Sequence, residues 1–167
     1  MNIKDLHRIV ATAIIVKDNK YLILKRSPHK KVYPDRWTVP GGGLELDDYV
    51  NEAKTTEDAW YFVVDKFLRR EIKEETNLEV GELKYLLDLV FIRPDNIPVL
   101  TLSYWAEYEP KGSLDSGQEK LGEIKLDEDH TEYFWGTVEE LRAYDLIEGI
   151  YDEIKMVDDI LKSEAKS

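Results

Sequence analysis

The sequence predicts a layered domain of strands and helices, of the α/β or α+β class. Two kinds of segment are interspersed along its 167 residues. Short β-branched and apolar runs bounded by Gly, Pro, Asn or Asp predict strands, whereas stretches with apolar residues three and four positions apart predict helices. This interspersion is typical of helices packed on a sheet. Because 43% of the residues are hydrophobic, the chain can form a core, and we expect one domain over residues 1–167.

The first elements are extended. Residues 8–16 are apolar on both faces, as in a buried strand. Residues 21–25 form a second strand, and the Lys-Asp-Asn-Lys turn before it makes the pair a hairpin. A loop over 27–36 leads to a short extended piece at 37–39. Three successive glycines follow, and such a segment lets backbone approach a ligand closely.

The second half of the chain contains the long helix. Residues 58–76 have apolar side chains at helical spacing. Asn77 provides a stop, because asparagine tolerates the left-handed conformation that ends many helices. The elements expected after it are strands at 83–93, 99–108 and 133–137, a loop over 110–130, and helices at 138–144 and 147–162.

Composition narrows the function class. Asp and Glu number 35 against 23 Lys and Arg, for a net charge of -12, whereas nucleic-acid-binding modules more often carry a basic surface. The chain has no cysteine, which excludes disulfides, thiolate metal sites and cysteine nucleophiles. No apolar run approaches the roughly 20 residues that span a bilayer, and the N-terminus lacks an apolar signal region. We therefore expect a soluble cytoplasmic protein with no DNA or membrane partner.

One segment departs from the acidic balance. Residues 17–36 hold seven basic and two acidic residues, a local charge of +5. The basic residues are Lys17, Lys20, Lys25, Arg26, Lys30, Lys31 and Arg36. The segment is either a solvated loop or an anion site on an otherwise acidic molecule.

Three carboxylates mark the end of the long helix. Glu71, Glu74 and Glu75 stand at positions i, i+3 and i+4, so they share an arc of roughly 100°. Their mutual repulsion needs more positive charge than the adjacent Arg70 supplies. A hard divalent cation bound through oxygens fits best, Mg²⁺ before Ca²⁺ where phosphates are present. Taken by itself, the glutamate cluster would also be explained as the surface of an ordinary charged helix. The glutamates, the glycines and the basic segment together suit a metal-bridged polyphosphate.

These motifs resemble those of a known family. Pro40-Gly41-Gly42-Gly43 followed by Arg70-Glu71-Ile72-Lys73-Glu74-Glu75-Thr76-Asn77-Leu78 is similar to the Nudix box of the MutT-like hydrolases. A tryptophan before the Pro-Gly-Gly and the later Trp135-Gly136-Thr137-Val138-Glu139-Glu140-Leu141 also match that family's habits. The resemblance extends over about residues 8–160. It implies an α/β/α sandwich with a mixed β-sheet.

The box departs from the family pattern in three places. The spacing between glycine loop and helix is 14 residues too long, which places an insertion at about 47–61 that must bulge outward. Asp48 stands where the pattern has Glu, and Asn77 stands where it has Gly. Trp60 and Tyr61, near the end of the insertion, either pack against the domain or line the site.

The resemblance implies a Mg²⁺-dependent hydrolase, with Mn²⁺ as an alternative metal. Its substrate would be a nucleoside diphosphate derivative such as a nucleoside triphosphate, ADP-ribose, a nucleotide sugar or a dinucleoside polyphosphate. The implied metal ligands are Glu71, Glu74, Glu75 and the main-chain carbonyl of Gly41. The implied catalytic residues are Glu71 and Glu74, with Arg70 holding the glutamates by ion pairs. The implied substrate-binding residues are Arg26, Gly42 and Gly43.

In the implied reaction, water attacks phosphorus and a carboxylate takes its proton. A box glutamate is the first candidate for this base. A carboxylate from a later loop is the second, and the candidates there are Glu128, Asp129 and Glu132, with His130 among them. The family includes both monomers and homodimers.

Three other readings compete. An isopentenyl diphosphate isomerase on the same scaffold would need a catalytic cysteine, which the chain lacks. A catalytically silent Nudix-scaffold module for nucleotide binding or protein interaction would be expected to have lost box carboxylates, but all three are present. An unrelated acidic Ca²⁺-binding domain would need clustered loop ligands, and Asp127-Glu128-Asp129 lacks the twelve-residue EF-hand pattern.

Overall fold

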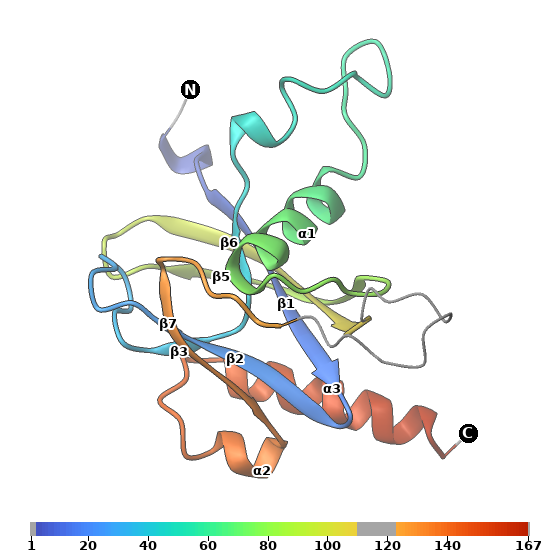
Figure 1. The fold of residues 1–167 in the computed structure, drawn as a ribbon. Coiled ribbons are helices and arrows are strands. Elements are labelled where there is room, and N and C mark those ends of the chain that lie inside the picture. Colours follow the sequence, from blue (N-terminus) through green and yellow to red (C-terminus); the bar gives the residue numbers. More distant parts are fainter. Residues whose placement is uncertain (1–2, 110–122, 167) are drawn as a thin grey trace.

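The computed structural model describes residues 3–109 and 123–166 (Figure 1). The strands are β1 (Arg8–Lys17), β2 (Lys20–Arg26), β3 (Trp37–Thr38), β4 (Gly41–Gly43), β5 (Lys84–Ile92), β6 (Pro98–Glu107) and β7 (His130–Gly136). The helices are α1 (Val63–Thr76), α2 (Val138–Leu141) and α3 (Ile150–Glu164), with short 3₁₀ turns at Ile3–Asp5 and Leu46–Asp48. Over this part of the chain, no helix combines the length and the apolar character needed to cross a bilayer.

The strands form one mixed sheet. Its main order is β3-β2-β1-β6-β5, with β4 paired to β1 and β7 paired to β2. β1 and β6 run parallel, and the other pairs are antiparallel. The predicted mixed sheet is therefore confirmed.

Helices cover both faces of this sheet (Figure 1). On β1, Ala11, Ala13 and Ile15 contribute to the core under α1, whereas Ile14 and Val16 contribute to the core under α3. This alternation explains why the strand is apolar on both faces. The arrangement is the α/β/α sandwich that the resemblance implied.

The sheet opens between β1 and β2. These strands pair only beside their turn, at Val16–Tyr21 and Lys17–Lys20. Asp18 and Asn19 in the turn have φ of 50° and 58°, as a tight hairpin with right-handed twist requires. Farther from the turn, β4 pairs with β1 and β3 pairs with β2, so the glycine segment occupies the gap.

Several boundaries differ from the predicted ones. α1 begins at Val63 rather than at 58, because Phe62 has a left-handed φ of 59° that interrupts the helix. The three glycines form the short strand β4 instead of an irregular loop, since β1 offers them ladder partners. β7 begins three residues early, at His130, and α3 begins at Ile150. Most of the loop predicted over 110–130, residues 110–122, lies outside the described residues.

The insertion bulges away from the sheet between β4 and α1 (Figure 1). Trp60 packs edge-to-face on Tyr49, its indole N–H donates to the Glu52 carbonyl at 3.0 Å, and Lys54 lies over its ring. The insertion thus packs largely on itself, while Tyr61 is about half exposed. Because the extra residues project outward, α1 still packs against β4.

Candidate functional site

The glycine strand and the C-terminal half of α1 face each other. The Gly41 N–H donates to Glu75 Oε2 at 2.9 Å. A Cβ built on Gly42 would overlap the carboxyl group of Glu71. α1 is rotated this way because Leu68 and Ile72, on the same side, are buried in the core. Two of the three box glutamates therefore lie directly against glycine backbone.

This contact predicts the effect of Gly42→Ala. The backbone of Gly42 has an ordinary φ, and the neighbouring atoms belong to a flexible side chain, so we expect the fold to persist. Glu71 must move, however, and we expect metal affinity and kcat/KM to fall about 10–100-fold. Gly81→Ala is the matched control, because its Cβ would crowd the carboxylate of Glu109 instead. Metal titration and kinetics of both variants test this, and wild-type values for Gly42→Ala would contradict it.

Arg70 connects the insertion to the box. Its guanidinium lies 2.6 Å from Asp48 Oδ1, 2.9 Å from Glu71 Oε1 and 2.7 Å from Glu74 Oε2. Burial lowers the pKa of Arg70, but the hydrogen bonds that it donates to Asp48 and the nearby carboxylates raise it above its usual value overall. Asp48 is almost fully buried and Glu74 is half exposed. Arg70 therefore holds one carboxylate from the start of the insertion and two from α1.

Glu71 and Glu75 are the desolvated members of the cluster. Burial raises the pKa of Glu75 well above its ordinary value, against the lowering effect of the Gly41 N–H. Burial also raises the pKa of Glu71, although the adjacent Arg70 opposes the rise. Carboxyl groups placed this way favour a neutralising ligand, either a proton or a cation.

A buried histidine lies beside Glu75. His130 Nε2 is 3.9 Å from Glu75 Oε1, and His130 Nδ1 is 2.8 Å from Asp127 Oδ1. Burial lowers the pKa of His130, against the effect of Asp127, and so favours the neutral imidazole. One ligand atom from each of these three side chains lies within 4.8 Å of the others. Carboxylate and imidazole together suit a divalent metal.

The late-loop candidates are not part of the cluster of Glu75, Asp127 and His130. Glu128 is exposed. Asp129 pairs with Lys30 at 2.5 Å, and Glu132 pairs with Lys25 at 2.7 Å. From the sequence, Asp127 is considered only as part of a Ca²⁺-binding loop and His130 is given no role, because their position beside Glu75 depends on the pairing of His130 with Arg26 across β2 and β7.

A polar cavity of about 600 Å³ opens over the glycine strand. The basic side chains lining it are Arg8, Arg26, Lys30, Lys31 and Arg93. The acidic ones are Glu45, Glu71, Glu75 and Asp129, and Gly41, Gly42 and Gly43 also line it. Three of the cations come from the basic segment, whereas Arg8 and Arg93 come from β1 and the end of β5. Cationic side chains and two of the box glutamates, Glu71 and Glu75, therefore line the same cavity.

Arg26 is held in place within this cavity. Its guanidinium donates to the Val32 carbonyl at 2.9 Å and to the Tyr33 carbonyl at 3.2 Å. Burial lowers its pKa, while Glu75 and Asp129 act in the opposite direction. Two backbone carbonyls therefore fix the position of this cation before any ligand arrives.

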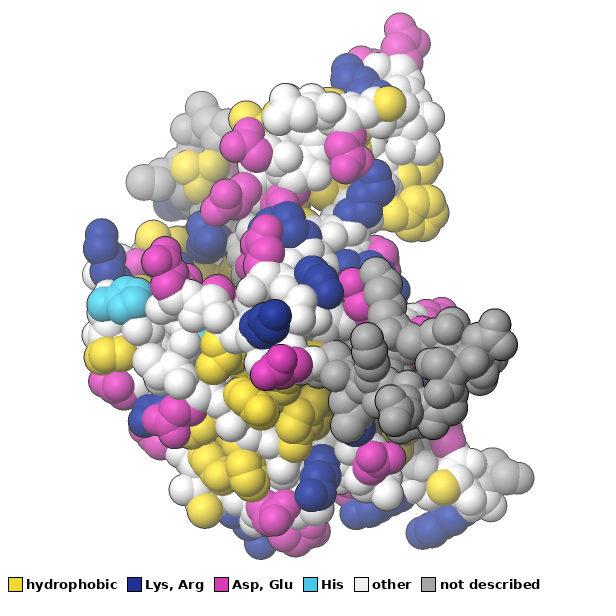
Figure 2. Space-filling model, in the orientation of Figure 1, with side chains coloured by type: hydrophobic (Ala, Val, Ile, Leu, Met, Phe, Trp, Pro, Cys, Tyr) yellow, Lys and Arg dark blue, Asp and Glu magenta, His cyan; other side chains and the backbone are white. Residues whose placement is uncertain are grey.

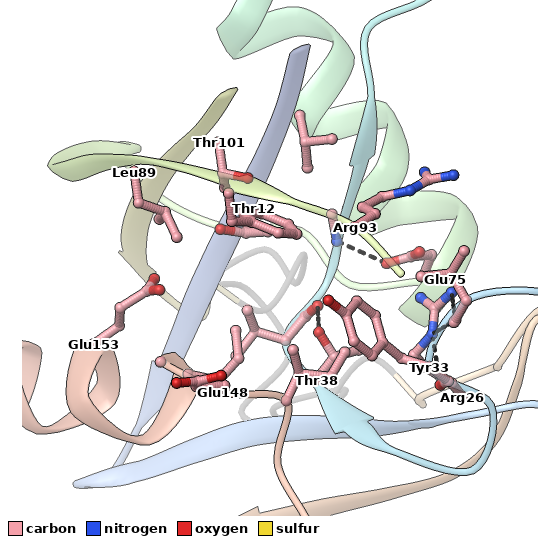
Figure 3. A pocket seen from close by; sticks show the side chains of 18 of the residues that line it. Thr12, Arg26, Tyr33, Thr38, Glu75, Leu89, Arg93, Thr101, Glu148 and Glu153 are labelled. Carbon is pink, nitrogen blue, oxygen red and sulfur yellow. Dashed lines mark hydrogen bonds between the residues drawn. The ribbon is translucent and has the colours of Figure 1, made fainter. Parts of the chain in front are cut away.

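A second cavity, of about 530 Å³, adjoins the first (Figure 3). The two share Arg26, Gly41, Glu75, Arg93 and His130 in their walls. Its apolar lining comes from Val10, Val32, Val39, Leu89, Phe91, Ile92, Ile147 and Ile150. A ligand with a charged end and a flat, less polar end would fill both cavities.

The face of the molecule shown in Figure 2 mixes both signs of charge. Acidic and basic side chains are interspersed there around apolar patches, and the coloured atoms form no continuous basic stripe. A basic stripe is the usual footprint of a nucleic-acid-binding protein.

Comparison with known proteins gives consistent relatives. No family model matches the chain. It is 25% identical over 152 residues to the nucleoside triphosphatase NudI of Escherichia coli K12, covering 83% of this chain and 88% of that protein. The MutT protein of Methanosarcina mazei Go1 aligns with a TM-score of 0.64 and 20% identity over 93% of this chain and 96% of its own. The NUDIX domain of Shewanella oneidensis NrtR, solved with ADP ribose, aligns with a TM-score of 0.66 and 15% identity over 96% and 94%.

Proposed function

Since the chain belongs to the Nudix hydrolase family, we propose that it hydrolyses the diphosphate linkage of a nucleoside diphosphate derivative in a Mg²⁺-dependent reaction. The observation that carries this proposal is a pair of glutamates, the partly buried Glu71 and the buried Glu75, set against glycine backbone in a cation-lined cavity. Nucleoside triphosphates are the first substrates to test, because the curated relative is named as a nucleoside triphosphatase.

The donor set fits a divalent metal. Glu71 and Glu75 are desolvated carboxyls, and the His130 imidazole and Asp127 adjoin Glu75. We assign Glu71, Glu75 and the Gly41 carbonyl as the residues that hold Mg²⁺, or Mn²⁺ in its place, with Glu74 beside them on Arg70. When bound, the metal supplies Lewis-acid stabilisation of phosphate oxygens and makes water more acidic.

The protein's own groups perform the remaining tasks. Arg26, Lys30 and Arg93 bind the nonbridging phosphate oxygens from the cation-lined wall. Water attacks one phosphorus, and the bond to the bridging oxygen breaks to release two phosphorylated products. Glu75 Oε2 is engaged by the Gly41 N–H, which leaves Oε1 to take the proton of the water. His130, 3.9 Å from that oxygen, is placed to receive the proton next.

The raised pKa values of Glu71 and Glu75 predict how Mg²⁺ stabilises the protein at different pH. Between the ordinary and raised pKa values, the folded protein holds protons that the unfolded chain has released. Without metal, stability therefore falls as pH rises through that window. Metal binding requires the ionised carboxylates, so we expect the Mg²⁺-induced rise in Tm to be larger in mildly alkaline than in mildly acidic buffer. Thermal unfolding with and without Mg²⁺ measures this, and an equal or larger rise in acid would contradict it.

A nucleotide panel in ¹⁸O-labelled water tests the function. We expect Mg²⁺-dependent cleavage of at least one diphosphate-containing nucleotide, with a single ¹⁸O in one of two phosphorylated products. Mass spectrometry of the products identifies the phosphorus attacked. Tight nucleotide binding with no cleavage of any substrate would favour the silent binding module instead.

A further inference from the structure

The apolar cavity holds a buried carboxyl group that the reaction does not use. Glu153 lies on the first turn of α3, is 6% exposed, and lines this cavity (Figure 3). The Ser103 hydroxyl on β6 donates to its Oε2 at 2.6 Å. Burial raises the pKa of Glu153, against the effect of this hydrogen bond. Oε1 accepts no hydrogen bond from the described residues, so this oxygen is available to a ligand.

A second polar group shares the same space. Thr12 on β1 lines the cavity, and its buried hydroxyl has no hydrogen-bond partner within residues 3–109 and 123–166. Buried polar groups in folded proteins are normally satisfied. An unpartnered hydroxyl and a half-satisfied carboxyl between apolar walls therefore point to a ligand that completes their hydrogen bonds.

The position of the cations orients that ligand. Arg26 and Arg93 lie on the wall shared with the polar cavity, together with Glu75. The phosphates of the substrate consequently occupy the polar cavity, and the group at the other end enters the apolar one. Walls formed by residues such as Leu89 and Phe91 suit a flat base better than a hydroxyl-rich sugar, which would lose its hydration there.

We propose that Glu153 is a specificity-determining residue that selects nucleotides whose base carries an exocyclic amino group. The amino group donates to Glu153 Oε1, while Ser103 holds the other oxygen in place. A base with a keto oxygen at that point has no N–H to donate to Glu153. Its oxygen would either lie against the carboxylate, which repels it, or turn away and leave Oε1 without a hydrogen bond. This inference rests on the proposed function, since it assigns the substrate class of the same site.

Matched substrate pairs provide the test. CTP against UTP and ATP against ITP replace the amino group by a keto oxygen, whereas GTP against ITP replaces it by hydrogen. We expect wild-type protein to favour the amino member of at least one pair by about tenfold or more in kcat/KM. Glu153→Leu removes the acceptor at similar volume, and we expect it to bring that ratio close to one. The control is Asp159→Asn, which changes an exposed carboxyl on the same helix and should keep the wild-type kcat/KM ratio.

A second variant and a binding measurement complete the experiment. Should Glu153→Leu fail to fold, Glu153→Gln replaces it, and its amide N–H₂ should shift preference toward the keto base. Calorimetry with CMP and UMP in EDTA should show the same preference without any metal. Equal kcat/KM values for the two members of every pair, or a kcat/KM ratio that is unchanged in both variants, would overturn the inference and leave the proposed function intact. Cleavage of no nucleotide at all would overturn the proposed function and this inference with it.

Discussion

Glu75→Gln should remove most of the hydrolytic activity, with kcat falling about 10²–10⁴-fold. The variant keeps the size of the side chain and an oxygen that can accept from the Gly41 N–H. It loses the negative charge that we assign to metal binding and the oxygen that we assign as proton acceptor. Steady-state kinetics on the best nucleotide of the panel, with saturating Mg²⁺, measures the effect.

Stability separates this loss from simple misfolding. Glu75 is buried and its desolvated charge is unfavourable, so we expect Glu75→Gln to unfold at the same or a higher Tm than wild type without metal. The Mg²⁺-induced rise in Tm should shrink. The matched control is Glu82→Gln, which changes an exposed carboxyl between α1 and β5 and should retain activity. Undiminished kcat in Glu75→Gln would refute the assignment.

Arg70→Met should lower both stability and activity. The substitution leaves Asp48, whose side chain is 4% exposed, and Glu71 without their shared cation. Because the guanidinium itself is partly solvated, we expect a loss of about 1–3 kcal/mol in the free energy of unfolding. Displacement of Glu71 and of the insertion should also lower kcat/KM about 10–100-fold.

A neighbouring arginine controls for the loss of stability. Arg69, on the same helix, donates to the Val80 and Gly81 carbonyls at 2.9 Å and pairs with Asp65. Arg69→Met should therefore destabilise the protein while leaving kcat near the wild-type value. Urea unfolding and kinetics of both variants separate the two roles. Equal loss of kcat in both would mean that Arg70 has no particular effect on the glutamates.

Local patterns were sufficient to predict the helices and the strands of this fold other than β4. The apolar run of β1, the two left-handed turn residues after it and the 3.6-residue spacing before Asn77 all act over short distances in the chain. Asn77 ends α1 with a φ of 62°, as expected of the residue that replaces glycine there. The spacing of Glu71 and Glu75 likewise predicted that they share a helix face.

The remaining parts of the site depend on contacts between distant segments. Arg8 and Arg93 reach the polar cavity only because β1, β6 and β5 are neighbours in the sheet. His130 lies beside Glu75 only through the pairing of β7 with β2. Glu153 looks like an ordinary helical glutamate in the sequence, and only the packing of α3 on the sheet buries it. No local spacing encodes these distances.

The central claim is that Glu71 and Glu75, held against the glycine strand, bind the divalent metal that the substrate needs. Anomalous diffraction from crystals soaked in Mn²⁺, for wild type and Glu75→Gln, tests it most directly. We expect a manganese peak within coordination distance of both carboxylates and the Gly41 carbonyl in wild type, and a weakened or absent peak in the variant. A wild-type peak elsewhere, or none at this site, would contradict it.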